Sequence, residues 1–396
     1  MTQFAAVTYQ TVPWVSRIPP DLISKRQASR IPKTYEAAVP VSIADAQFDV
    51  DGGLAALAEE ASHLLMRADE DASHSISAAP LAAVLLRTES AASSQIEYLT
   101  VSARQLAIAE IGQAASSNAH LVAANVDAMR SAIDIAGAID EAAILRMHEA
   151  LMRITRRAKP GEWRDEQVWI GSSGLSPADA AYVPPVPQRV PEAMADLVAF
   201  MQRGDLPVIV HCAVAHAQFE TVHPFIDGNG RTGRAVMHAM MRWAGITRFA
   251  TVPVSAGLLS RVDDYVAALT AFRYGDIRPI VQEVAHAAER AVRLQRQLTD
   301  ELASVEASWR EAARPRRGSA LARLIGLAIG QPALNVETVV RDLGVSRTAA
   351  RYAIDQAVTT GILTPASDKK RNRIWLAQDV LDALDAFAAR AERRIG

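Results

Sequence analysis

The chain lacks the features that mark a secreted, membrane or strongly polyanion-binding protein. Its 396 residues include one cysteine, Cys212, so an intrachain disulfide is impossible and a reducing cytoplasm is the expected compartment. No run approaches the ~18 uninterrupted apolar residues that a membrane helix needs. The N-terminus also lacks the basic start and apolar core of a secretory leader. Lys and Arg number 42 against 44 Asp and Glu, and this net charge of −2 does not indicate a nucleic-acid or membrane partner.

Hydrophobic residues make up 50% of the chain, which is typical of a soluble globular protein. The length is enough for two or three domains with sizeable cores. Helical spacing of apolar residues recurs along most of the chain, which predicts a mainly α fold. Residues 1–40 are rich in proline, and we expect them to lie extended over the surface.

The most informative stretch is residues 223–234, which read His-Pro-Phe-Ile-Asp-Gly-Asn-Gly-Arg-Thr-Gly-Arg. Pro224 disfavours helical geometry at the preceding residue, so His223 should end a helix and project into a cleft. Asp227 is a hard oxygen ligand of the kind that Mg²⁺ accepts alongside phosphate oxygens. The stretch therefore combines a base with a carboxylate suited to a metal.

The second half of this stretch predicts an anion site. Gly228, Asn229 and Gly230 are residue types that tolerate positive φ, and their successive N–H groups are expected to form an anion-binding nest. A helical pattern begins at Arg231, which places the nest at a helix N-terminus, where the dipole favours phosphate. Arg231 and Arg234 share a face of that helix's first turn. Together these features indicate chemistry on a nucleotide polyphosphate.

The stretch resembles the signature of the Fic (filamentation-induced-by-cyclic-AMP) family, His-x-Phe-x-Asp/Glu-Gly-Asn-Gly-Arg-x-x-Arg, with every fixed position present. The resemblance implies a Fic-type helical bundle that transfers AMP from ATP to a Ser, Thr or Tyr hydroxyl of a target protein, itself included. It implies His223 as the general base and Asp227 as the Mg²⁺ ligand. Residues 228–230, Arg231 and Arg234 would then hold the ATP phosphates.

An upstream segment, Ser93 to Tyr98, is expected to open a helix. Fic proteins often carry an inhibitory helix with the pattern Ser/Thr-x-x-x-Glu-Gly/Asn; Ser93 and Glu97 match it and Tyr98 does not. The resemblance implies that Glu97 pairs with Arg234 and blocks productive placement of the γ-phosphate. A local alternative is a capping box in which Ser94 is the N-cap and Glu97 reaches back, and the two interpretations are compatible.

A hairpin is predicted between the helical region at residues 103–158 and the helix expected over residues 191–202. Val168–Ile170 should form a short strand, residues 172–179 a turn, and residues 182–185 the returning arm. This pattern resembles the hairpin flap of Fic proteins, along which a target segment can add as an extra strand and register its hydroxyl against His223. The alternative is a surface hairpin that packs Trp169 into the core.

A break at residues 315–318, Pro-Arg-Arg-Gly, predicts a domain boundary. We therefore expect an N-terminal Fic-associated region, a Fic catalytic core and a C-terminal domain over residues 1–100, 101–314 and 318–396, respectively. The C-terminal pattern is that of a winged helix-turn-helix, with helices over 321–329, 336–343 and 346–358 and wing strands over 361–363 and 373–376.

Basic residues of the C-terminal domain concentrate at the wing tip, residues 368–372, and at Arg347 and Arg351 of the third helix. A phosphate-contacting face has this distribution, so DNA is one expected partner. The alternative is a scaffold or homodimer contact with solvated charges.

Other activities stay open because the expected base pocket departs from the family pattern. Where many Fic proteins have Tyr-Tyr and then an asparagine, this chain has Tyr265-Val266 and Arg273-Tyr274. Transfer of other phosphate-containing groups and removal of AMP are alternatives within the enzyme class. An ATP-sensing DNA-binding regulator is an alternative of another class, although sensing alone does not require a base such as His223.

Overall fold

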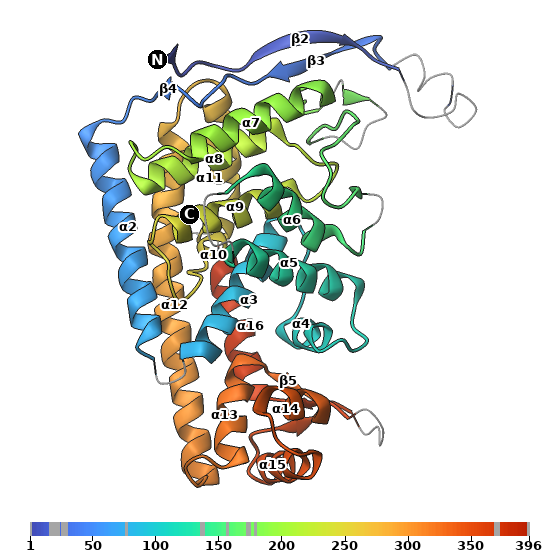
Figure 1. The fold of residues 1–396 in the computed structure, drawn as a ribbon, viewed down its shortest axis with the longest axis vertical. Helices are drawn as coiled ribbons and strands as arrows, with labels where there is room; N and C mark the ends of the chain where they lie inside the picture. The colour runs from blue at the N-terminus through green and yellow to red at the C-terminus, as the bar shows by residue number, and fades with distance from the viewer. Residues whose placement is uncertain are drawn as a thin grey trace.

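A computed structural model describes residues 2–15, 24, 31–75, 78–134, 139–155, 158–171, 176–177, 180–367 and 373–393. Helices dominate it, so the prediction of a mainly α fold is confirmed (Figure 1). No helix in these ranges combines the length and the apolar character needed to cross a lipid bilayer.

The helices of the described residues are α2 (Gly52–Ser73), α3 (Ala78–Ile96), α4 (Ala103–Glu110), α5 (Ser117–Ile133), α6 (Glu141–Met152), α7 (Val190–Met201), α8 (Val208–Val222), α9 (Asn229–Trp243), α10 (Val254–Leu259), α11 (Val262–Arg273), α12 (Arg278–Ala313), α13 (Ala320–Gly330), α14 (Val336–Leu343), α15 (Arg347–Thr359) and α16 (Gln378–Glu392). A 3₁₀ turn, η4 (Pro187–Arg189), precedes α7. The strands are β1 (Thr2–Gln3), β2 (Thr8–Pro13), β3 (Thr34–Val39), β4 (Ala46–Gln47), β5 (Ala333–Leu334), β6 (Thr364–Pro365) and β7 (Trp375–Leu376).

Helix α8 forms the centre of the bundle. Its residues from Ile209 to Val222 are all buried, as expected for a helix that is apolar on every side. The neighbouring helices α2, α7, α9, α11 and α12 pack around it. The residue that follows α8 is therefore held by a rigid core.

Helix α12 connects the two ends of the molecule. Its 36 residues extend ~54 Å at 1.5 Å per residue, along α2 and then past α13 and α16 (Figure 1). One apolar cluster joins Leu85 of α3 and Leu302 of α12 to Leu324 of α13 and Leu384 of α16. The C-terminal elements thus share a core with the helices that precede them.

The N-terminal region forms a two-stranded ribbon. Strands β2 and β3 pair antiparallel from Thr8↔Val39 to Pro13↔Thr34, and β1 pairs parallel with β4. The Ala38 N–H of β3 donates to the carbonyl of Val183 (3.0 Å). This contact places the ribbon beside the returning arm of the predicted hairpin, residues 182–185.

The prediction that a helix opens near Ser93 is wrong, because α3 ends there. Ser94 is not an N-cap: its hydroxyl donates to the carbonyl of Ser90 one turn earlier (2.9 Å). The apolar residues from Leu81 onward continue the same helix to Ile96, and Tyr98 leaves helical geometry at φ +61°. A Ser-x-x-Glu pattern caps a helix only where the residues before it are not already helical.

The predicted strand at Val168–Ile170 is also wrong, since the structure has a single antiparallel bridge between Ile170 and Tyr182. The returning arm contains Pro184 and Pro185, which lack an N–H and so cannot extend a ladder. The side chain of Gln167 instead donates to the carbonyl of Pro184 (2.9 Å). Most of the predicted turn at 172–179 lies outside the described residues.

In the C-terminal region α13, α14 and α15 lie where helices are predicted. Three short strands form a sheet in the order β5-β7-β6. The predicted strand at residues 361–363 is wrong: the N–H groups of Ile362 and Leu363 donate to the carbonyl of Ala357, so they complete the end of α15. The predicted wing tip, residues 368–372, lies outside the described part of the chain.

Candidate active site

The signature begins with a strained turn. His223 follows α8 with φ +50° and ψ +62°, a left-handed conformation that costs ~1–3 kcal/mol for a residue other than glycine. Buried Arg164 holds this turn: its Nε donates to the carbonyl of His223 (2.8 Å) and its Nη2 to that of Pro185 (2.5 Å). The backbone N–H of Arg164 donates to the carbonyl of Pro224 (2.9 Å). Arg164 therefore fixes the backbone on both sides of the imidazole.

The His223 imidazole is neutral near pH 7. Burial lowers its pKa to about 3, and the charges of Arg164 and Arg273 act in the same direction. The ring still has 18% of its side-chain surface exposed. A neutral imidazole at the edge of a cleft can accept a proton from an incoming hydroxyl.

A buried carboxyl lies beside this imidazole. Glu220, one turn earlier on α8, has its Oε2 3.7 Å from Nδ1 of His223. Burial raises the pKa of Glu220 to about 7, with the charge of Glu97 adding to the effect. At neutral pH the Glu220 carboxyl is therefore partly protonated.

The loop after His223 is fixed by its own side chains. Gly228 has φ +80° and caps α9, and a Cβ there would lie 3.0 Å from Leu151 and Met152. The Asn229 amide pairs with the backbone of Phe225 in both directions, accepting at 2.8 Å and donating at 2.9 Å. The Asn229 side chain thus shapes the loop, which leaves its backbone N–H as its group for the predicted anion nest.

His148 of α6 supports the same loop. Its Nδ1 accepts from the Gly161 N–H (3.0 Å) and its Nε2 lies 3.1 Å from the carbonyl oxygen of Asp227, which requires the neutral tautomer protonated at Nε2. Burial lowers the pKa of His148 to about 4. The ring stacks on Phe225 with centroids 3.6 Å apart. His148 and Arg164 escape sequence analysis because each lies in an ordinary-looking segment far from the signature.

Arg231 presents unmatched donors at the N-terminus of α9. Its side chain is 4% exposed, and its Nε and Nη1 have no hydrogen-bond partner among the described residues. Its Nη2 reaches only to 3.5 Å from Asp227 Oδ1. Buried donors without partners are costly, and a helix N-terminus attracts anions, so this site is suited to phosphate.

Asp227 fits the part of a Mg²⁺ ligand that shares the ion with a substrate. Its side chain is 57% exposed, and its Oδ1 accepts from the Gly228 N–H (2.6 Å). The described residues contain no group of three or more His, Cys, Asp and Glu side chains that would enclose a metal. One carboxylate with phosphate oxygens and water is a common arrangement for Mg²⁺.

Glu97 lies against the first turn of α9. Arg234, fully buried, donates through Nη2 to Glu97 Oε1 (3.0 Å) and to the carbonyl of Ser93 (2.7 Å), and through Nε to the Ser93 hydroxyl (2.8 Å). A Cβ built at Gly230 would be 1.9 Å from Glu97 Oε1. The Glu97 carboxylate therefore takes a position where an anion would meet the helix N-terminus.

The predicted flap lies beside α8. Its residues Val168–Ile170 are half-buried, and Trp169 packs edge-on against Trp14 with ring centroids 5.5 Å apart. Tyr182, the bridge partner of Ile170, donates its hydroxyl to the carbonyl of Thr221 (2.8 Å), two residues before His223. The guanidinium of Arg273 lies 3.7 Å from the centre of the Tyr182 ring. This anchoring places the arm next to the candidate base.

The Fic/DOC family model matches residues 138–241, which run from the start of α6 to near the end of α9. The chain contains a Fic domain. This domain holds the signature loop, His148, Arg164 and the flap, whereas Glu97 reaches it from outside, at the end of α3.

Two curated relatives each match a little over a third of the chain. Protein adenylyltransferase fic-1 of Caenorhabditis briggsae is 31% identical over 152 residues, covering 38% of this chain and 27% of that protein. Protein adenylyltransferase Fic of Nematostella vectensis is 30% identical over 153 residues, covering 38% of this chain and 32% of that protein. The chain thus spans between about a quarter and a third of the length of the curated relatives it matches.

A solved structure shares the fold over a longer stretch. The crystal structure of a Fic family protein from Desulfovibrio desulfuricans G20 matches with a TM-score of 0.53 and 23% identity. The match covers 83% of this chain and 97% of that chain, so the shared architecture extends well beyond the Fic domain itself.

Proposed function

We propose that this protein is an adenylyltransferase that moves AMP from ATP to a Ser, Thr or Tyr hydroxyl of a target protein, itself included. The observation that carries the proposal is the pairing of two features at one loop. Arg231 offers buried, unmatched donors at the N-terminus of α9, and neutral His223 stands at the end of α8. The relatives named protein adenylyltransferase support the same reaction.

In the proposed reaction, Nε2 of His223 takes the proton of the acceptor hydroxyl, whose oxygen attacks the α-phosphorus of ATP. The bond from the α-phosphorus to the bridging oxygen breaks, and pyrophosphate leaves. Arg231 and the N–H groups of residues 228–230 hold the phosphates and offset their charge. Asp227 would hold Mg²⁺, which supplies further neutralisation of the phosphate charge when it is bound.

We propose that Glu97 inhibits this reaction in the conformation described here. Its carboxylate pairs with Arg234 and lies over Gly230, so it adds negative charge where a phosphate group would bind. Ser93 strengthens the inhibited arrangement, because two of the three Arg234 contacts go to that residue. Activation then requires that the end of α3 move or that Glu97 be displaced.

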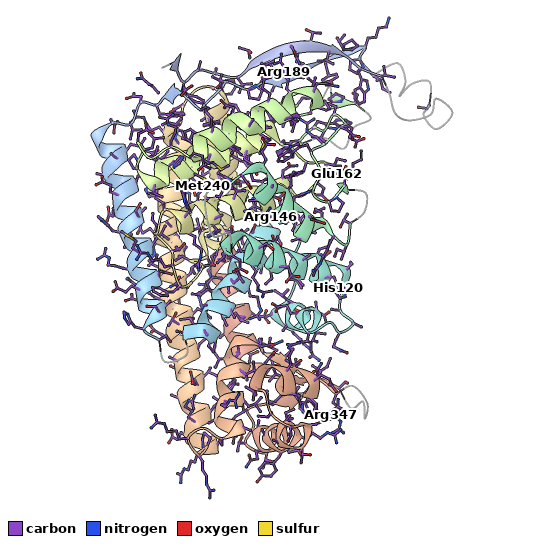
Figure 2. The ribbon with its side chains drawn as sticks, viewed as in Figure 1. His120, Arg146, Glu162, Arg189, Met240 and Arg347 are labelled. Atoms are coloured by element: carbon purple, nitrogen blue, oxygen red, sulfur yellow. The ribbon has the colours of Figure 1, made fainter. Side chains whose placement is uncertain are left out.

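The C-terminal region is proposed to be a winged helix that contacts DNA. Helix α15 packs Ala350 and Ala353 inward and exposes Arg351 and Tyr352. Arg347 lies at the outer surface of this end of the molecule (Figure 2). An exposed arginine and tyrosine at the N-terminal half of such a helix suit phosphate and base contacts. Binding to mixed-sequence DNA at low salt, lost in Arg351→Glu and retained in Arg293→Glu, is the expected result.

The test of the transfer reaction uses ATP labelled at the α- or the γ-phosphate in parallel. Protein should acquire label from α-labelled ATP alone, since nucleotidyl transfer releases the γ-phosphate in pyrophosphate. His223→Ala should abolish the labelling, and His120→Ala, at an exposed histidine of α5 (Figure 2), should not. Equal labelling of the wild type and His223→Ala would show that His223 is not the base. Label from γ-labelled ATP alone would indicate phosphoryl transfer.

A further inference from the structure

A cavity of about 520 Å³ lies between helices α3, α4 and α5 and the C-terminal helices α13 and α14. Its walls come from α3, α4, α5, α13 and α14 and from Arg153, which follows α6, and they include no residue of the signature loop. The volume falls within the ~300–1,000 Å³ range of small-molecule sites. Figure 1 shows α13 and α14 at the lower end of the molecule, below α5.

The cavity is lined by more cations than carboxylates. Four arginines line it, against the carboxylates of Glu110 and Asp127: Arg87, Arg130, Arg153 and Arg341. Asp127 is shared, because both Arg130 (3.0 Å) and Arg153 pair with it. Arg341 pairs with the adjacent Asp342, so the four arginines face three carboxylates, and the remaining positive charge favours an anionic ligand.

Arg87 supplies a donor that the protein does not satisfy. The residue is 6% exposed, with its Nε 2.6 Å from Glu110 and its Nη2 donating to the carbonyl of Gly330 (3.1 Å). Its Nη1 is buried and has no hydrogen-bond partner within the ranges that the structure describes. A buried guanidinium nitrogen without a partner is unfavourable, and an anion oxygen in the cavity would relieve it.

Small side chains leave the walls between these arginines open. Ala83 of α3 and Ala123 of α5 face the cavity with Gly326 of α13. A Cβ built at Gly326 would meet no atom within 4 Å. Glycine is unfavourable in a helix interior, and here no close packing accounts for it.

We propose that this cavity is a binding site for a phosphorylated small molecule of nucleotide size. The guanidinium groups of Arg87, Arg130 and Arg341 hold its phosphate oxygens, for which their planar forks are suited. Arg87 lies on α3, ten residues before Glu97, so an occupant touches the helix that carries the proposed inhibitory carboxylate. The site is separate from the signature loop and does not depend on the proposed transfer reaction.

The experiment is isothermal titration calorimetry of the full chain with ATP and, separately, with inorganic tripolyphosphate. Gly326→Leu fills the cavity from a position with free space, and Arg341→Gln removes a charge that is 69% exposed and pairs only with the adjacent Asp342 among the described residues. Arg293→Gln is the matched control, since this arginine of α12 is 58% exposed and pairs with Glu289.

Wild type and Arg293→Gln should show a binding event that Gly326→Leu lacks and that Arg341→Gln weakens about tenfold, as for loss of one charge-assisted contact. The event should persist in Arg231→Ala, which separates it from the signature loop. Binding of both compounds identifies the phosphate chain as the recognised group, and binding of ATP alone identifies a nucleotide. Identical isotherms for all four proteins, or an unchanged affinity in Arg341→Gln, would overturn the proposal.

Discussion

At the scale of single residues, the site depends on a histidine whose backbone is strained and whose ring is largely buried. His223 takes a left-handed conformation that a side chain normally avoids, and Arg164 compensates by binding the carbonyls around it. Arg164 remains charged near neutrality although burial lowers its pKa to about 10. The geometry of the candidate base is thus set by a residue that binds the backbone around it.

Replacing Arg164 should therefore impair the reaction through His223. Arg164→Met leaves the carbonyls of His223 and Pro185 without their donor, and we expect the rate of AMP transfer to fall at least tenfold, or about 1.4 kcal/mol. Arg146→Met, at an exposed position of α6, is the control (Figure 2). Labelling rates at saturating ATP measure the effect, and equal rates for the two variants would show that the turn holds without Arg164.

Four histidines whose pKa values are lowered by burial make stability depend on pH: His148, His211, His216 and His223. Burial lowers the pKa of His148 to about 4 and the pKa values of His216 and His223 to about 3, against an ordinary value of 6.5. Below pH 6.5 the unfolded chain binds protons that the folded chain does not, so stability should fall as pH falls from 6.5 towards 4. Glu220 and Glu283 oppose this effect, because burial raises the pKa of both carboxyls, that of Glu220 to about 7, and a raised carboxyl pKa favours the folded state as pH falls.

Calorimetric melting across pH 4 to 7 should show Tm decreasing with acidification below 6.5, since four histidines outweigh two carboxyls. His216→Gln, which can keep a hydrogen bond to Tyr265, should reduce the dependence of the free energy of unfolding on pH by about 1.4 kcal/mol per pH unit. A Tm that is constant or rises on acidification would contradict the buried neutral state of these rings.

The signature residues were predictable from sequence because each carries its chemistry locally. Pro224 predicts that His223 leaves the helix, and Gly228 predicts the turn, which the structure realises at φ +80°. Arg164 and His148 were not predictable, since their importance arises from contacts with residues 60 to 80 positions away. No local sequence pattern indicates that a buried arginine or histidine will hold a distant loop through hydrogen bonds to its backbone.

At the scale of elements, the proposed inhibition depends on the contact between α3 and α9. Glu97 follows the last turn of α3 and pairs with Arg234 in the first two turns of α9. A second polar contact joins the same helices, because fully buried Glu89 of α3 lies 2.9 Å from Nε2 of His238. Displacing Glu97 therefore bends or unwinds the end of α3 more easily than it separates the two helices.

Glu97→Gly should raise AMP transfer and ATP affinity by removing the carboxylate from the first turn of α9. Tyr98→Gly is the control for helix-end flexibility, because glycine suits the φ of +61° at this position and leaves Glu97 in place. Labelling should rise in the first variant and stay low in the second. A similar rise in both would assign inhibition to the rigidity of the helix end, and no rise in either would leave Glu97 a structural residue.

The sequence predicts the start of a helix near Ser93, where the structure has the end of α3. The residues from Ser93 to Glu97 satisfy both a capping pattern and the end of an amphipathic helix, and local sequence cannot choose between them. The flap shows the same limit of local sequence. Pro184 and Pro185 indicate an extended arm, but they also prevent that arm from forming a ladder of hydrogen bonds with residues 168–170. In both cases packing against other elements decides the outcome.

At the scale of the whole molecule, the C-terminal region is bound to the rest through side chains as well as through α12. Trp309 of α12 is 4% exposed and donates to Asp379 at the start of α16 (2.8 Å). Arg390 of α16 makes two contacts of 2.9 Å with Glu301. The predicted boundary at 315–318 follows the end of α12. The local sequence does not indicate that the elements on its two sides share one apolar core.

Trp309→Ala should destabilise the entire chain, because it removes a buried ring from the shared cluster. The expected loss is ~3–5 kcal/mol, with a single lowered transition in thermal melting. Trp243→Ala, at a ring that is 46% exposed, should change stability by less than ~1 kcal/mol. Two separate transitions, with the second at the wild-type temperature, would show that the C-terminal elements unfold independently.

The central claim is tested most directly by intact-protein mass spectrometry of Glu97→Gly after incubation with ATP and Mg²⁺. The protein should gain the mass of one or more AMP groups, and Glu97→Gly combined with His223→Ala should gain none. A gain of phosphate mass, or equal gains in both proteins, would contradict transfer of AMP with His223 as the base.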